Sequence, residues 1–387
     1  MYLLKKSIQS DPDREGKQFM IRFALIPSTL FFLGMLLATN CSSNPVSPLE
    51  LKQIEIDGYT WTYLGLEDKW VTAVEDTPWG LFAGTREEGV FRFDEETGGW
   101  TSLGLDRAPI SDIAFADCEK PRIFVGVCCC IEGQEQYTPA AVFASFDRGN
   151  TWLESDGGLA KKYEGNLWAR TLLVDHQNPD RVFFGQDVPQ LFKSDDGGQS
   201  WDFISGNYNE SGGGMEFIVL SPKRDGRIWF GGQTAFFSPA IYRSDDWGRD
   251  AEVVYIPEHD GWVAKIIVDT INPDLLWMIE TGRVAMSVNA GETWETILAP
   301  ALEPSNETVL FNGLLMDNEI LFAAGARTLP QTYPWEHELR LYRSMNQGAS
   351  WDTLAVPEGA IGARGLEFDR NMNLLIPTAN GLWRVER

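Results

Sequence analysis

The sequence repeats one short polar motif, and this repetition limits the possible folds more than any other feature. Ser, Asp or Asn, Gly and Trp stand at offsets 0, 2, 4 and 7 in four segments: "SFDRGNTW" (145–152), "SDDGGQSW" (194–201), "SVNAGETW" (287–294) and "SMNQGASW" (344–351). A catalytic site would not need four copies, whereas a structural unit recurs. The motif therefore predicts a repeat protein.

The residue types of the motif suit a tight hairpin turn. Asp and Asn accept hydrogen bonds from nearby backbone N–H groups, Gly permits a positive φ, and Trp can cover the base of the hairpin. We therefore expect a structural role for these residues: Ser145, Asp147, Gly149, Trp152, Ser194, Asp196, Gly198, Trp201, Ser287, Asn289, Gly291, Trp294, Ser344, Asn346, Gly348 and Trp351.

A longer unit surrounds each turn. Before two of the turns, residues 169–192 and 264–285 each contain an apolar run, an Asn-Pro-Asp turn, a second apolar run, a loop and a third run. With the run after Trp, each unit holds four short strands. The steps from Trp100 to Trp152 and on to Trp201 are 52 and 49 residues. This period and strand count are typical of β-propeller blades.

The pattern predicts an all-β, seven-bladed propeller over residues 57–387. The blades are expected at 66–104, 109–155, 167–205, 214–256, 262–298, 307–355 and 361–387. The seventh lacks a fourth strand, but "WTYLGLE" (61–67) nearly repeats "WTSLGLD" (100–106), the fourth strand of the first blade. We expect the N-terminal strand to complete the last blade, because an open ring would expose unpaired strand edges.

The turns resemble those of the Asp-box (bacterial neuraminidase, or BNR, repeat) propellers, a superfamily with sialidase-like, Ycf48-like and sortilin-like branches. Two degraded copies, one ending at Trp100 and one with Ala251 in the Trp position, extend the resemblance over most of the propeller. The resemblance implies the fold. It does not imply an activity, because the motif lies away from the ligand face in that family.

The N-terminus has the pattern of an export signal. An apolar run (23–37) follows Lys17 and Arg22, and small residues precede Cys41. This resembles a bacterial lipoprotein signal, in which Cys41 would receive lipid. Asn40 fits that pattern poorly, so plain cleavage stays an alternative. We assign 1–41 to the signal, with translation starting at Met1 or Met20, and 42–56 to a flexible tether.

Export and charge limit the partners. We expect an outer-membrane or cell-surface lipoprotein of a bacterium, or else a periplasmic or secreted protein. The net charge is −24, so nucleic acid would be repelled and membrane contact should come only through the lipid. We expect a monomer with no cofactor and no metal. An oxidising compartment would favour a disulfide from Cys118 to Cys128 or Cys130.

Five arginines are candidates for a ligand site, because they stand at similar places near the start of a first strand or after a second. They are Arg86, Arg170, Arg283, Arg327 and Arg364. If they converge on the central opening they form a patch for carboxylates. The alternative is pairing with Glu87, Glu88, Glu280 or Asp187.

Aromatic residues in long loops could form a binding rim, or could pack against one another. The longest such loop, 325–338, carries Tyr333 and Trp335; the others are Tyr137, Phe236 and Phe237.

The expected function is binding of a glycan or of a protein or peptide, with no catalytic residues. The alternative is a sialidase- or glucanase-like glycoside hydrolase with a carboxylate pair on the ligand face. The spacing assigns no Tyr with a partner Glu. The candidate carboxylates are Asp187, Glu258, Asp260, Glu280 and Glu336.

Overall fold

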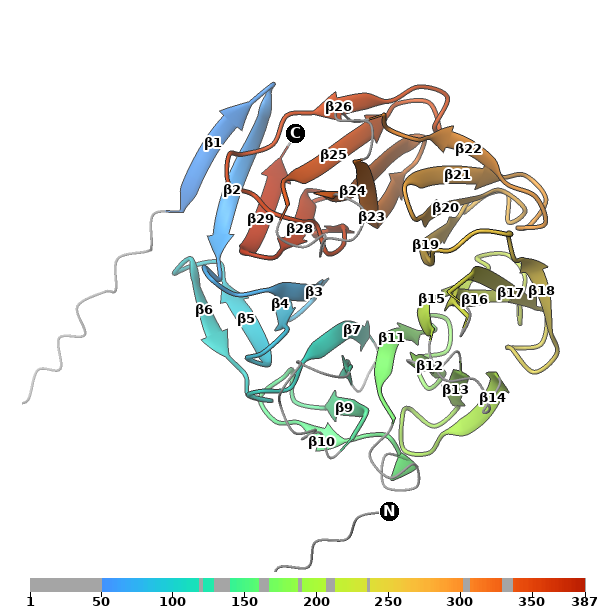
Figure 1. Ribbon diagram of the computed structural model, residues 1–387. Coiled ribbons are helices and arrows are strands. Elements are labelled where there is room, and N and C mark those ends of the chain that lie inside the picture. The colour runs from blue at the N-terminus through green and yellow to red at the C-terminus, as the bar shows by residue number, and fades with distance from the viewer. Residues whose placement is uncertain are drawn as a thin grey trace, which may run out of the picture. The chain divides into compact units, whose positions relative to one another are not determined.

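The protein is a ring of seven antiparallel sheets around a central axis (Figure 1). The structure is a computed structural model that describes residues 51–117, 121–128, 140–159, 167–186, 190–206, 213–234, 237–301, 307–328 and 337–386. The prediction of an all-β, seven-bladed propeller is confirmed. Within these residues, no helix has the length and hydropathy that a membrane span requires.

Six blades are built from four consecutive strands each. The first three contain β3 (Val71–Thr77), β4 (Gly80–Thr85), β5 (Val90–Asp94) and β6 (Gly99–Ser102); β7 (Ile110–Ala116), β8 (Arg122–Val127), β9 (Val142–Ser145) and β10 (Leu153–Glu154); and β11 (Ala169–Val174), β12 (Val182–Gln186), β13 (Gln190–Ser194) and β14 (Asp202–Gly206). The next three contain β15 (Gly214–Leu220), β16 (Ile228–Gln233), β17 (Pro239–Ser244) and β18 (Ala251–Tyr255); β19 (Val263–Val268), β20 (Leu276–Glu280), β21 (Arg283–Ser287) and β22 (Glu295–Leu298); and β23 (Thr308–Asp317), β24 (Ile320–Thr328), β25 (Leu339–Ser344) and β26 (Asp352–Leu354).

The seventh blade joins the two ends of the propeller, as the sequence predicts. β27 (Glu367–Phe368), β28 (Leu374–Thr378) and β29 (Gly381–Glu386) pair in order, and β29 then pairs with β2 (Tyr59–Gly65) from the start of the ring. Tyr63 stands opposite Trp383, and the Trp61 and Trp383 rings meet edge to face at 6.1 Å. The N-terminal strand therefore closes the ring.

The seventh blade also has a fifth strand, which the sequence analysis did not predict. β1 (Lys52–Ile56) pairs with β2, so the expectation of a tether extending to residue 56 is wrong for these residues. Asp57 and Gly58 connect the two strands with φ of 50° and 81°. Asp-Gly favours the two-residue hairpin turn that needs positive φ twice, so the hairpin forms locally and continues the blade outward.

The repeated turns lie between the third and fourth strands and share one hydrogen-bond pattern. Ser145 Oγ donates to Asp147 Oδ1 (2.8 Å) and accepts from the Gly149 N–H (2.7 Å), while Asp147 Oδ1 accepts from the Thr151 N–H (2.8 Å). Gly149 has φ of 86°, and a Cβ there would lie 2.8 Å from Phe82 Cε1 in the preceding blade. The glycine is required both by the turn and by contact between blades.

The motif tryptophans connect neighbouring blades in three places. The indole Nε1 of Trp100 donates to the Leu64 carbonyl (2.7 Å), that of Trp152 to Leu103 (2.9 Å) and that of Trp201 to Ser155 (2.6 Å). Each acceptor lies at the end of the preceding blade. The turns thus bind one blade to the next, which is a structural role beyond covering their own hairpin.

Removing β1 and β2 should open the ring. A variant that begins at Glu67 loses the β2–β29 ladder and the Trp61–Trp383 contact. We expect its melting temperature, followed by circular dichroism, to fall by at least about 10 °C or the cooperative transition to be lost. A variant that begins at Asp57 loses only β1 and should melt within a few degrees of the wild type. Equal melting of both variants and the wild type would contradict closure by β2.

Candidate functional site

The candidate site is the central channel, which the inner strand of every blade lines. Its volume is about 1250 Å³. The inner strands are β3, β7, β11, β15, β19, β23 and β27. The first six of these surround the central opening in Figure 1. We call the end of the channel at which these strands begin the N-terminal mouth.

A β-bulge near the start of the inner strand turns one residue toward the channel in each of blades one to six. The pairing shifts at these positions, and the bulged residues are Thr72, Ser111, Arg170, Glu216, Ala264 and Asn312. Arg364 holds the equivalent place in blade seven, because Ala363 bridges Thr378 while the Arg364 N–H donates to the Pro377 carbonyl. All seven line the channel. Bulges commonly re-aim side chains in this way.

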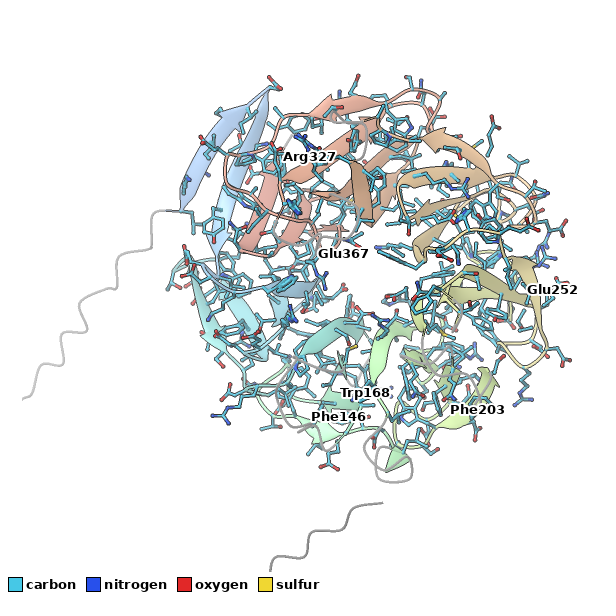
Figure 2. All side chains as sticks on the ribbon, viewed as in Figure 1. Phe146, Trp168, Phe203, Glu252, Arg327 and Glu367 are labelled. Carbon is cyan, nitrogen blue, oxygen red and sulfur yellow. The ribbon has the colours of Figure 1, made fainter. Side chains whose placement is uncertain are left out.

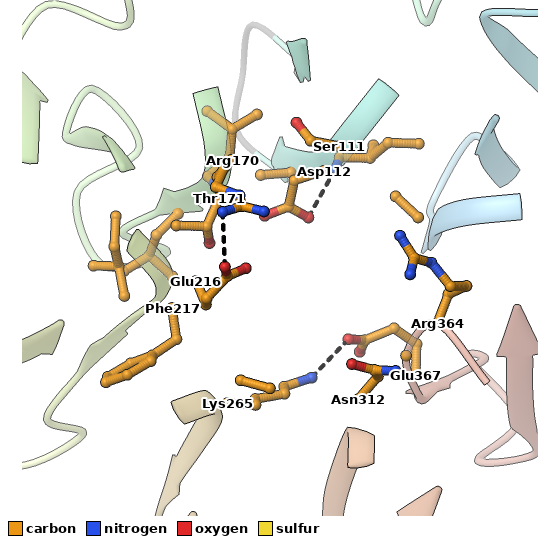
Figure 3. A pocket seen from close by; sticks show the side chains of 18 of the residues that line it. Ser111, Asp112, Arg170, Thr171, Glu216, Phe217, Lys265, Asn312, Arg364 and Glu367 are labelled. Atoms are coloured by element: carbon orange, nitrogen blue, oxygen red, sulfur yellow. Dashed lines mark hydrogen bonds and ion pairs between the residues drawn. The ribbon is translucent and has the colours of Figure 1, made fainter. Parts of the chain in front are cut away.

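Several bulge residues also link one blade to the next. Thr72 Oγ1 donates to the Ile110 carbonyl at 2.6 Å, and Ser111 Oγ donates to the Ala169 carbonyl at 2.5 Å. In blade three an ion pair takes this place: Arg170 Nη1 lies 2.9 Å from Glu216 Oε1 of blade four (Figure 3). The same sheet position therefore holds the ring together in some blades and presents charge to the channel in others.

Three of the five predicted arginines meet at the N-terminal mouth. The Arg86 and Arg364 guanidinium groups lie over the Trp70 ring, at 4.3 and 5.1 Å from its centre. Burial lowers the pKa of Arg364 to about 10, and the positive charge of Arg86 is the second cause of this decrease. The charge of Arg170 lowers the pKa further, whereas the negative charge of Glu216 raises it. Arg86, Arg170 and Arg364 thus act on one another as a cationic group; we call them the arginine layer.

The other two predicted arginines lie elsewhere. Arg283 Nη2 lies 2.5 Å from Glu280 Oε2, and Arg327 pairs with Glu307. Neither belongs to the described lining of the channel, and Figure 2 shows Arg327 well away from the central opening. For Arg283, pairing with Glu280 is the alternative that the sequence analysis left open.

The remaining candidates from the sequence divide between described residues and residues outside the described part of the chain. Cys128 is described and lines the channel, and Phe237 is described and 61% exposed. The residues outside the described ranges are Cys41, Cys118, Cys129, Cys130, Tyr137, Asp187, Phe236, Tyr333, Trp335 and Glu336.

The channel lining also includes a group of carboxyl side chains that the sequence analysis missed. Glu75, Asp112 and Glu367 line the channel, and Lys265 Nζ lies 3.1 Å from Glu367 Oε1 (Figure 3). Figure 2 places Glu367 beside the central opening. We call the three carboxyl groups the acidic layer. Within the described residues, no group of three or more His, Cys, Asp or Glu has the arrangement to hold a metal ion.

Two carboxyl groups of the acidic layer, Glu75 and Asp112, hold their protons unusually tightly. Burial raises the pKa of Glu75 well above its ordinary value, and the charges of Glu367 and Asp112 raise it further. Burial also raises the pKa of Asp112 to about 6, although the backbone N–H groups of Leu172 (2.7 Å) and Ile113 (2.9 Å) stabilise its charged form. Carboxyl groups that share one cavity cannot all ionise without mutual repulsion.

The signal that could have revealed this layer is a charged residue inside an otherwise apolar inner strand. Glu75 stands in "VTAVEDT", Asp112 in "ISDIAFA" and Lys265 in "VAKIIV". The bulge shifts the alternation of faces by one residue, so a strict period of two assigns these side chains to the wrong face.

A second polar cluster lies between blades four and five. Tyr255 donates to Glu280 Oε2 at 3.0 Å, and His259 Nε2 lies 3.2 Å from Glu280 Oε1. This is a Tyr–Glu pair that spacing alone could not assign. Burial and the Glu280 charge raise the pKa of Tyr255 well above its ordinary value, which disfavours a phenolate nucleophile. The other described candidates, Glu258 and Asp260, are exposed.

Raised carboxyl pKa values make stability depend on pH in a defined direction. The folded protein keeps a proton on Glu75 that the unfolded chain releases above its ordinary pKa of 4.5, so this group removes stability as pH rises. The melting temperature of Glu75→Gln minus that of the wild type should therefore become more positive from about pH 4 to about pH 8. The exposed Glu87→Gln serves as the control and should show no such trend. A difference that stays flat for Glu75→Gln would contradict the raised pKa.

Solved structures similar to this chain are β-propellers. The GH74 xyloglucanase from Xanthomonas campestris has a TM-score of 0.63 and 20% identity, covering 84% of this chain and 53% of that one. The GH74 enzyme from Niastella koreensis has a TM-score of 0.60 and 17% identity, with coverages of 83% and 53%. YCF48 from Cyanidioschyzon merolae has a TM-score of 0.57 and 13% identity, with coverages of 84% and 98%.

This chain therefore spans about half the length of the GH74 structures. The sequence matches no protein-family model and no curated protein. At these identities the likeness shows the fold alone, and it places the chain among the β-propellers.

Proposed function

We propose that the protein is an exported, lipid-anchored propeller that binds a carboxylate-bearing glycan or peptide at the N-terminal mouth. The observation that supports this proposal most is the arginine layer: three arginines at the opening of one channel, of which Arg86 and Arg364 lie over the Trp70 indole. Guanidinium forks pair with carboxylates through two parallel hydrogen bonds, and they do so more strongly away from bulk water.

The finer parts of the proposal rest on the sequence. The Ser-to-Trp turns support membership of the Asp-box group, and the apolar run before Cys41 supports export and lipid attachment. The chain as a whole carries a net charge of −24, which repels an acidic ligand. Binding of such a ligand therefore requires a local group of cations, and the arginine layer at the mouth is one.

Neutralising one arginine should weaken binding without unfolding the ring. Arg86 is partly exposed, so Arg86→Gln should keep the wild-type melting curve. On glycan and peptide arrays, we expect its affinity for the acidic ligands of the wild type to fall at least about tenfold, as for a lost charge-assisted hydrogen bond. Arg327→Gln removes a cation outside the channel and should bind like the wild type. Equal losses in both variants would contradict capture at the mouth.

A glycoside hydrolase is the second candidate, and the acidic layer is the observation that favours it. A carboxyl group that stays protonated near ionised carboxylates is the arrangement of a general acid with its partner. If the channel is catalytic, a panel of fluorogenic glycosides should show turnover that Glu75→Gln and Glu367→Gln each lower at least about a hundredfold. Turnover of this kind would replace the binding proposal, and its absence over the panel would leave binding as the function.

A further inference from the structure

The channel carries two layers of opposite charge. The arginine layer stands at the N-terminal mouth. In the acidic layer, Glu75 and Glu367 lie three residues further along their strands than the bulge position, and Asp112 lies one residue further. Figure 3 shows Arg170 and Arg364 together with Asp112 and Glu367 around one opening. A ligand that enters from the mouth would therefore meet cations first and carboxyl groups next.

The strand geometry gives the separation of Glu75 and Glu367 from the arginine layer. Glu367 follows Arg364 by three residues, and Glu75 follows the equivalent bulge residue Thr72 by three residues. A strand advances about 3.3 Å per residue, so these two carboxyl groups lie up to about 10 Å beyond the arginine layer along the channel, and Asp112, one residue after Ser111, lies up to about 3 Å beyond it. The bulge shortens this advance slightly, which makes the value an upper bound.

The acidic layer has more carboxyl groups than cations to pair with them. Lys265 is ion-paired with Glu367, whereas Asp112 is held by backbone N–H groups. Within the described residues, the Glu75 carboxyl has no hydrogen-bond or ion-pair partner, although it lines the cavity. One further ammonium group beside Glu75 and Asp112 would stabilise the ionised forms of both carboxyl groups, which burial disfavours in its absence.

We infer that the channel binds a short extended peptide with free termini, its carboxylate on the arginine layer and its ammonium on the acidic layer. This inference rests on the proposed function, that the mouth captures a carboxylate. An extended chain spans about 3.3–3.6 Å per residue, so about three residues match the separation of the layers. A single amino acid is too short to reach both layers, and an acidic glycan without an amino group would leave the acidic layer without a countercharge.

Capping the termini of one peptide tests the two charges separately. Isothermal titration of the full chain would use trialanine, N-acetyl-trialanine and trialanine amide. We expect trialanine to bind and each cap to weaken binding at least about tenfold, because each removes one charged contact. If trialanine amide binds weakly but N-acetyl-trialanine binds as well as trialanine, the carboxylate is recognised and the ammonium is not. This result would overturn the inference and still support capture of a carboxylate. Equal binding of all three would overturn both, and no binding of trialanine would overturn the inference.

Two variants assign the effect to the acidic layer. Glu75→Gln should lower the affinity for trialanine and leave that for N-acetyl-trialanine unchanged. Lys265→Met removes the cation that competes with the ligand ammonium, so it should raise the affinity for trialanine. Circular dichroism melting would confirm that both variants fold. If both variants bind trialanine like the wild type, the ammonium does not reach this layer and the inference is wrong.

Discussion

The hydrogen bonds between β2 and β29 close the ring, and the blades surround a channel only while the ring is closed. A sheet edge that ends in unpaired N–H and C=O groups is costly, and joining the two ends of the propeller removes the gap in the ring. Trp100 reinforces this joint, because its indole N–H bonds to Leu64 at the end of β2. The channel needs this closure, since its lining comes from all seven inner strands.

The bulges allow blades of the same architecture to present different side chains to the channel. A ring of identical blades would present the same side chain to the channel seven times. At the bulge position, Thr72 and Ser111 have a structural role, because each hydroxyl group donates a hydrogen bond to a carbonyl of the next blade. Arg170, Glu216 and Arg364 use the same position for charge. Because the bulge fixes only the direction of the side chain, its chemistry can vary from blade to blade while the sheet stays unchanged.

The charges within the channel oppose stability, and this makes the channel the strongest candidate for a functional site. Burial raises the carboxyl pKa values of Glu75 and Asp112 and lowers the pKa of Arg364, so each shift disfavours the charged form. Apolar residues at these positions would avoid the cost. Perturbed groups that gather in one cavity are the usual sign of binding or catalysis, whereas the paired arginines outside the channel, such as Arg327, fit a structural role.

The architecture could be predicted from the residues alone, because local turn chemistry repeats with the period of a blade. Ser145 and its counterparts predict the hairpins, and the likeness of 61–67 to 100–106 predicts the closing strand. Part of the site could be predicted as well: Arg86, Arg170 and Arg364 were candidates. Tertiary structure alone decided that these three converge while Arg283 and Arg327 do not, since convergence depends on the bulges and on blades far apart in sequence. It also decided the acidic layer, because a one-residue bulge reverses the face that a strand's alternation predicts for Glu75.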